Sequence, residues 1–243
     1  MTRTHGMMIT EFDAPSLPLL AQRAGFDFAL IDTEHGSYGT AALRALLMGG
    51  VLLPFPLLVR VGDHGAHGIA EVLDLGAAGI VVPHVDTAED AVAVVAAARY
   101  APLGSRGMST MKAHTRYDSS DVPGIIERAN AGVRVCVQIE SQQSVDNVEA
   151  IAAVPGVDML VVGPNDLAQD MGIPGELGSE RLLDAVRLVT DVAQRAGIES
   201  GTISSNLDYL EVCRQTAMTW FVVGSDVGHM MSGAKAALDR VRG

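Results

Sequence analysis

Two carboxylates that follow apolar segments of this chain could together hold a metal ion. Glu140 comes directly after the segment VRVCVQI, residues 133–139, and Asp166 follows the segment DMLVVG, residues 158–163. A charged residue on a buried strand is costly unless another group pairs with it. At the C-terminal end of a barrel strand, such a residue is also where enzymes hold metals and substrates. Two carboxylates from successive strand ends can hold one hard divalent cation, with the remaining positions left to water and substrate.

Other polar residues stand at corresponding points, where successive apolar segments end. They are Asp32, Thr33, Glu34 and His35, then Arg60, then Pro83 and His84, then Gln138, and finally Gly163, Pro164 and Asn165. In an apolar chain, this recurrence predicts that the polar side chains surround one pocket.

Two of these residues have side chains suited to catalysis. His35 stands near Asp32 and Glu34, and a neighbouring carboxylate can fix the tautomer of a histidine and support its role as a general base. Arg60 can grip a substrate carboxylate with two parallel hydrogen bonds. A structural interpretation stays open for each: His35 as a capping or packing group and Arg60 as an ion-pair partner. Glu140 and Asp166 could likewise be buried partners of Arg60 or of backbone amides.

Further positions give weaker signals. Gly163 and Pro164 would let the backbone approach a ligand closely, although the pair also suits an ordinary turn. Arg106 lies in a long polar segment, where it is either a second contact to an anionic substrate or a solvated loop charge. His64 and His67 are spaced like zinc ligands, but they supply only two of the ligands that a zinc site needs. No lysine ends a predicted strand, which disfavours a Schiff-base mechanism.

The elements that must position these residues alternate along the whole chain. Strands are predicted at 7–10, 27–32, 57–60, 79–82, 133–139, 158–162, 199–203 and 220–223. The clearest helical patterns lie at 87–99, with Asp86 as the expected cap, at 145–153, with Ser144 as the expected cap, and at 182–196. Eight strands alternating with helices predict one (β/α)8 TIM barrel over residues 1–243. A doubly wound open sheet is the alternative, but it usually has fewer strands and a glycine-rich first turn.

The composition limits the class of protein and its partners. Hydrophobic residues make up 48% of the chain, which supports a packed core and argues against disorder. The formal net charge is -12 without a dense basic run, so nucleic acid and anionic membranes are unexpected partners. Cys136 and Cys213 do not make a disulfide framework. With no signal-peptide pattern and no apolar stretch of ~20 residues, we expect a cytoplasmic protein that does not span a membrane.

The segments around the strand ends resemble the HpcH/HpaI aldolase family, which are metal-dependent pyruvate aldolases. The matching segments are GFDFALIDTEHGSYG, PLLVRVGD, LGAAGIVVPHVDTAEDA, ARYAPLGSRGMS, VCVQIESQQSVDNVEAI and GVDMLVVGPNDLAQDMG. They run from Gly25 to Gly172, and a looser match continues to Asp226. His84 departs from the pattern, since many relatives have methionine or another apolar residue at this position.

The resemblance implies roles for individual residues. His35 would be the catalytic base, Asp32 its acidic partner, and Arg60 the group that binds the keto acid and supports the enolate. Glu140 and Asp166 would be the protein ligands of a magnesium, manganese or cobalt ion. The remaining candidates would line the substrate pocket: Gln138, Gly163, Pro164 and Asn165.

The resemblance also implies a barrel of the phosphoenolpyruvate/pyruvate-binding type. Such barrels exchange their last helix, here residues 230–242, in homotrimers or homohexamers. The resulting hypothesis is a carbon–carbon lyase. It would reversibly cleave a 4-hydroxy-2-oxoacid into an aldehyde and pyruvate, or an analogue such as hydroxypyruvate, through a metal-stabilised enolate. Two alternatives stay open: an acyl-CoA hydroxyacid lyase of the citrate or malyl-CoA type, and a non-catalytic barrel that binds an oxoacid.

Overall fold

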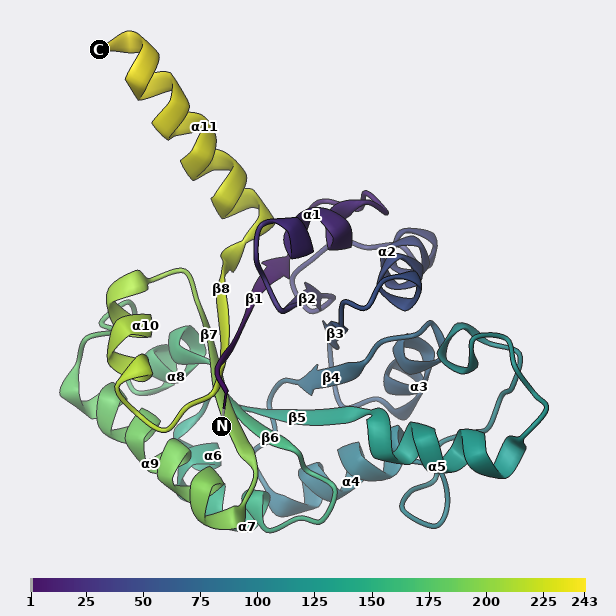
Figure 1. The fold of residues 1–243 in the computed structure, drawn as a ribbon. Helices are drawn as coiled ribbons and strands as arrows, with labels where there is room; N and C mark the ends of the chain where they lie inside the picture. Colours follow the sequence, from purple (N-terminus) through teal and green to yellow (C-terminus); the bar gives the residue numbers. More distant parts are fainter. Residues whose placement is uncertain (1) are drawn as a thin grey trace.

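A closed barrel of eight parallel strands forms the centre of the computed structural model, which describes residues 2–243 (Figure 1). The strands are β1 Thr4–Ile9, β2 Phe28–Asp32, β3 Leu57–Arg60, β4 Gly79–Val82, β5 Arg134–Ile139, β6 Met159–Val162, β7 Glu199–Ser204 and β8 Trp220–Ser225. The predicted (β/α)8 barrel and its eight strands are confirmed. β1 begins at Thr4, earlier than predicted, because Thr4 pairs with Trp220 where β8 closes the barrel.

Helices follow the strands around the outside of the barrel (Figure 1). They are α1 Leu17–Arg23, α2 Thr40–Leu52, α3 Ala66–Asp74, α4 Ala88–Ala98, the 3-10 turn η1 Ala113–Thr115, α5 Val122–Gly132, α6 Gln142–Asp146, α7 Val148–Ala152, α8 Pro164–Asp170, α9 Glu180–Ala196, α10 Leu207–Arg214 and α11 Asp226–Arg242. The predicted helix at 182–196 is confirmed as most of α9.

Two predicted helix caps are wrong. The cap of α4 is Thr87, whose side chain accepts a hydrogen bond from the backbone N–H of Asp90 (3.1 Å), while the Asp90 carboxylate accepts from the Thr87 N–H (2.9 Å). The cap of α6 is Ser141, whose side chain accepts from the N–H of Ser144. Each reciprocal pair satisfies amide groups that a helix end leaves free, and it moves the start of the helix by only a few residues.

The inside of the barrel is packed with side chains from alternating strand positions. These are Met8, Phe28, Leu30, Leu58, Val81, Cys136, Met159, Val161, Trp220 and Val222. The rings of Phe28 and Trp220 stack 4.6 Å apart. Gly6 and Gly201 leave room for these rings, because a Cβ atom at either glycine would lie within 2.6 Å of one of them. The larger apolar cluster fills the layer between the strands and the helices.

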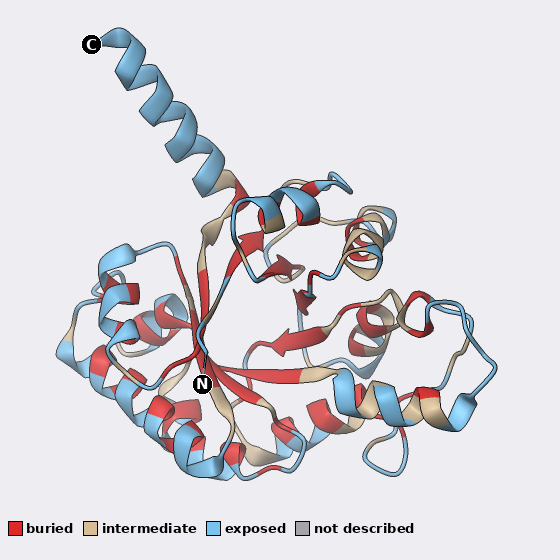
Figure 2. Cartoon of the chain, viewed as in Figure 1, coloured by how far each residue is buried: buried red, intermediate tan, exposed pale blue. Residues whose placement is uncertain are grey.

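The last helix, α11, projects away from the barrel as a separate rod (Figure 1). Asp226 at its first turn is its buried residue, and most of the remaining length is exposed (Figure 2). In residues 2–243, no helix combines the length and apolar character required to cross a bilayer.

Candidate active site

The polar residues at the strand ends point into the mouth of the barrel because side chains on a strand alternate between its two faces. On β5, Cys136 belongs to the interior cluster, so Gln138 and Glu140 follow it on the same face. On β2, Leu30 is inside and Asp32 continues the series; on β3, Arg60 follows the interior residue Leu58. Three strands that are distant in sequence therefore contribute charged groups to one end of the barrel.

Arg60 is held by two carboxylates. Its Nε donates to Asp32 Oδ1 (2.9 Å) and its Nη2 donates to Asp32 Oδ2 (2.7 Å), while Nη1 lies 3.1 Å from Glu34 Oε2. Burial alone would lower the pKa of Arg60, but Asp32 and then Glu34 outweigh this effect and raise the pKa. The guanidinium group is thus a fixed, permanently charged fork at the barrel mouth.

The expected pairing of Asp32 with the ring of His35 needs correction. The Asp32 carboxylate is occupied by Arg60 and by the backbone N–H groups of Glu34 (3.1 Å) and His35 (3.4 Å). The tight turn after β2 brings these amides to the carboxylate, and it leaves the His35 side chain exposed at the rim. Asp32 therefore positions Arg60 and the turn that carries His35.

A pocket of about 250 Å³ opens beside Arg60. Its lining joins the predicted residues His35, Arg60, Gln138, Gly163, Pro164, Asn165 and Asp166 with Met8, Ile203, Ser204, Ser205, Gly224 and Ser225. The sequence analysis missed the small residues at the ends of β7 and β8, Ser204, Ser205, Gly224 and Ser225, because small residues carry no distinctive chemical signal. Gly163 has no room for a side chain, since an added Cβ would lie 2.8 Å from Glu140 Oε2 and 2.9 Å from Gln138 Nε2.

Glu140 and Asp166 have the chemistry that a hard divalent cation requires. Burial raises the pKa of Glu140; hydrogen bonds from Gln138 and His84 oppose this shift, and the charge of Asp166 adds to it. Gln138 Oε1 is buried without a hydrogen-bond partner beside these carboxylates. Residues 2–243 contain no preformed group of three or more His, Cys, Asp or Glu side chains around a common point. The residues fit an ion held by two carboxylates, with oxygens of other groups completing the shell.

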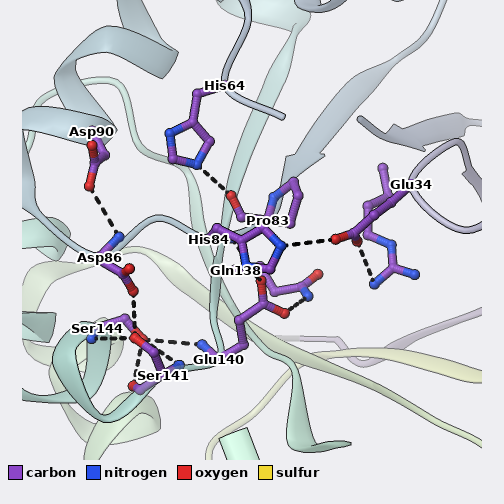
Figure 3. Close-up of polar contacts among 11 residues, drawn as sticks. Glu34, His64, Pro83, His84, Asp86, Asp90, Gln138, Glu140, Ser141 and Ser144 are labelled. Carbon is purple, nitrogen blue, oxygen red and sulfur yellow. Dashed lines mark hydrogen bonds and ion pairs between the residues drawn. The ribbon is translucent and has the colours of Figure 1, made fainter. Parts of the chain in front are cut away.

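His84 and Glu34 form a bridge across the barrel mouth that the sequence analysis did not predict. His84 Nδ1 lies 3.0 Å from Glu140 Oε1 and Nε2 lies 3.2 Å from Glu34 Oε1 (Figure 3). Beyond their place at strand ends, the sequence indicated Glu34 only as a carboxylate near His35, and His84 only as a departure from the family pattern. The signal was their position directly after β2 and β4, which places them at the same end of the barrel as Glu140.

Arg106 does not join this site, which corrects the expectation of a second substrate contact. Its Nη2 donates to Asp74 Oδ1 (2.6 Å), and its guanidinium group lies 4.7 Å from the centre of the Tyr100 ring. It lines a different cavity, together with Leu57 and Val133 at the N-terminal ends of β3 and β5. The chain direction of parallel strands places this cavity at the opposite end of the barrel from Arg60.

Comparisons with known proteins identify the family. Residues 7–233 match the model of the HpcH/HpaI aldolase/citrate lyase family. A 4-hydroxy-2-oxovalerate aldolase of Novosphingobium aromaticivorans is 39% identical over 191 residues, which are 76% of this chain and 72% of the relative. A 5-keto-4-deoxy-D-glucarate aldolase of Klebsiella pneumoniae is 35% identical and covers 89% of this chain and 84% of the relative.

A solved structure gives the same result. The crystal structure of an HpcH/HpaI aldolase/citrate lyase family protein from Burkholderia cenocepacia has a TM-score of 0.91 and 29% identity, and the match covers 100% of this chain and 95% of that chain. The chain belongs to the HpcH/HpaI aldolase/citrate lyase family. The predicted family, barrel and carbon–carbon lyase class are confirmed, and membership of the family supports a divalent metal as cofactor.

Proposed function

We propose that this protein reversibly cleaves a 4-hydroxy-2-oxoacid into an aldehyde and pyruvate, or a pyruvate analogue such as hydroxypyruvate. The observation that carries this proposal is the convergence of Arg60, Gln138 and Glu140 at one end of the barrel, beside a pocket lined by His35 and Asp166. The activity named for the Novosphingobium relative supports the same class of substrate.

Glu140 and Asp166 are the proposed protein ligands of a divalent ion, with Mg²⁺, Mn²⁺ and Co²⁺ as candidates. When bound, such an ion acts as a Lewis acid that polarises the substrate carbonyl and makes negative charge on its oxygen less costly. Gln138 and the backbone at Gly163 and Pro164 would form the wall against which the oxoacid lies, with Asn165 at its edge.

Arg60 is the proposed group that stabilises the charge developing on the substrate. Its Nε and Nη2 are fixed by Asp32, so the guanidinium group does not have to reorganise when the C3–C4 bond breaks. A preorganised donor of this kind is worth about 10²–10³-fold in rate. The group is 7% exposed, so water competes little for it.

His35 is the proposed base. It lines the pocket at the rim and would accept the proton of the C4 hydroxyl group during cleavage, directly or through a water molecule. In the reverse reaction it would return that proton to the new hydroxyl oxygen. The lysines of the chain, Lys112 and Lys235, lie at the start of η1 and on α11, so the proposed mechanism uses no Schiff base.

We also propose an oligomeric state and a cellular location for this protein. Residues 1–243 would act as one barrel domain in the cytoplasm and form a homotrimer or homohexamer. The barrel of another subunit would cover the exposed side chains of Met230, Met231, Leu238 and Val241 on α11. An exchanged helix would explain why these four apolar side chains project into solvent in the single chain.

Exchange of the pyruvate methyl protons for deuterium, followed by NMR, tests the proposal. EDTA-treated protein should be inactive, and addition of Mg²⁺, Mn²⁺ or Co²⁺ should restore exchange, because exchange requires the enolate without any aldehyde. A screen of aldehydes would then define the second product. If no metal restores exchange, the aldolase mechanism is wrong for this chain, and an acyl-CoA lyase or an oxoacid-binding barrel takes its place.

A further inference from the structure

His84 adopts a backbone conformation that residues other than glycine rarely adopt. Its φ angle is 55°, in the left-handed region, although its side chain is 64% exposed and has no burial to stabilise it. Such a residue persists only when its surroundings hold it in place, and these residues concentrate at functional sites. Asparagine, aspartate and histidine tolerate this region better than other residues with side chains.

Several polar contacts hold His84 in this conformation. The carbonyl oxygen of the preceding Pro83 accepts a hydrogen bond from His64 Nε2 (2.6 Å). The backbone N–H of His84 donates to Glu140 Oε1 (2.7 Å), and the ring joins Glu140 to Glu34 (Figure 3). His64, which resembled half of a zinc site in the sequence, instead supports the turn after β4.

The two oxygens of Glu140 have different surroundings. Oε1 faces His84 and receives both its backbone N–H and the ring nitrogen Nδ1. Oε2 accepts from Gln138 Nε2 and faces Gly163, and both of these residues line the pocket. Oε2 is therefore the oxygen that Glu140 presents to the pocket, whose lining includes Asp166.

We propose that His84 is a positioning residue that fixes Glu140 so that Oε2, and not Oε1, is offered to the metal ion. This inference rests on the proposed function, because it assigns Glu140 to the metal. Carboxylates that bind metals are commonly oriented by hydrogen bonds from residues outside the coordination shell, and loss of such a partner typically costs about 10–100-fold in metal affinity.

The geometry favours positioning over direct coordination by the histidine. Each ring nitrogen of His84 is directed at a carboxylate oxygen, Nδ1 at Glu140 and Nε2 at Glu34, so neither is directed at the pocket. Glu34 in turn contacts Arg60. His84 thus links the proposed metal ligand to the arginine that would stabilise the developing charge. Methionine or another apolar residue at this position could not make either contact of the ring.

Two matched variants separate the ring nitrogen from the backbone conformation. His84→Gly removes the side chain, and His84→Asn keeps an N–H donor near the position of Nδ1; both residues tolerate a φ of 55°. The affinity for Mn²⁺ is measured from the loss of the free-ion EPR signal. Each purified protein is first treated with EDTA to remove bound metal. We expect a dissociation constant about 10–100-fold higher for His84→Gly. For His84→Asn we expect a value within about threefold of the original protein, because its amide N–H can replace the Nδ1 donor.

The results distinguish this inference from the proposed function. If the original protein binds no Mn²⁺, the metal site itself is wrong. If it binds Mn²⁺ and His84→Gly binds Mn²⁺ equally well, only the role of His84 is overturned. That role is also overturned if His84→Asn binds Mn²⁺ as weakly as His84→Gly. Pulsed EPR with Mn²⁺ gives a further check. A directly coordinated histidine nitrogen that is present in the original protein and absent from His84→Asn would make His84 a ligand and would also overturn positioning.

Discussion

At each end of the barrel a buried arginine pairs with an aspartate, and the pairs Arg60–Asp32 and Arg106–Asp74 have different surroundings. Arg60 and Asp32 meet at 2.7 Å at the C-terminal ends of β2 and β3, and Arg106 and Asp74 meet at 2.6 Å on the other side, near the N-terminal ends of β3 and β5. The side chains of both arginines are at most 9% exposed. The contact itself therefore does not distinguish a catalytic pair from a structural one.

The neighbours of each pair make the difference. Arg60 is also in contact with Glu34 and lines the pocket that His35 and Asp166 share. Arg106 stacks on Tyr100 and ties the long segment after α4 to α3 through Asp74. In barrel enzymes, the C-terminal end of the strands carries the chemistry, and conserved features of the other end serve stability. The same pair of residues thus serves a proposed active site at one end and loop packing at the other.

Replacing each arginine with lysine should produce the largest difference between the two ends of the barrel. Arg60→Lys keeps the charge but loses the fork, so we expect kcat/KM for aldol cleavage to fall by about 10²–10³-fold. Arg106→Lys should leave kcat/KM within about threefold and lower the free energy of unfolding by about 1 kcal/mol, because the stacking on Tyr100 is lost. Steady-state kinetics measure kcat/KM, and urea unfolding measures the free energy of unfolding, for both variants. Equal losses of activity in the two variants would contradict the assignment.

A second pair of variants tests whether a Cβ atom can be added beside Glu140 and beside Arg106 without loss of activity. In Gly163→Ala, the added Cβ would lie 2.8 Å from Glu140 Oε2, so the carboxylate must move. Since displacement of a reacting group by about 1 Å can cost about 10²-fold, we expect deuterium exchange into pyruvate to slow by about 10–100-fold. Gly107→Ala, in the segment that carries Arg106, meets no atom within 4 Å and should exchange at the original rate. If deuterium exchange into pyruvate is unchanged in Gly163→Ala, Glu140 does not have the proposed role in the mechanism.

The smallest expected effect concerns the pH dependence of stability at the Arg106 end. Burial, and then the charge of Arg106, lower the pKa of His114, so the folded protein favours the neutral ring. The unfolded chain binds a proton with the ordinary pKa of about 6.5, so the free energy of unfolding should fall as the pH drops from 7 through 6.5 towards the lowered pKa. His114→Gln should remove this slope in urea unfolding and leave kcat/KM unchanged. A slope that persists in the variant would assign it to another group.

Much of the site followed from the sequence because strand geometry is regular. Gln138 and Glu140 are two residues apart, so they share a face, and Arg60 at the end of the apolar strand β3 had to meet the same barrel mouth. Arg106 could not be placed in this way. It lies in a segment without periodicity, and its partner Asp74 belongs to a helix that precedes it by 32 residues in sequence.

The sequence by itself determined the alternation of strands and helices, the end of the barrel at which carboxylates and arginine gather, and the family. These depend on local periodicity and on the direction of parallel strands, which residue types record directly. Only the tertiary structure decided that Asp32 serves Arg60 and not the His35 ring, that Arg106 belongs to the other end, and that His84 joins Glu34 to Glu140. Partner choice among buried charges depends on distances between elements that are remote in the chain, and these distances exist only after the barrel has closed.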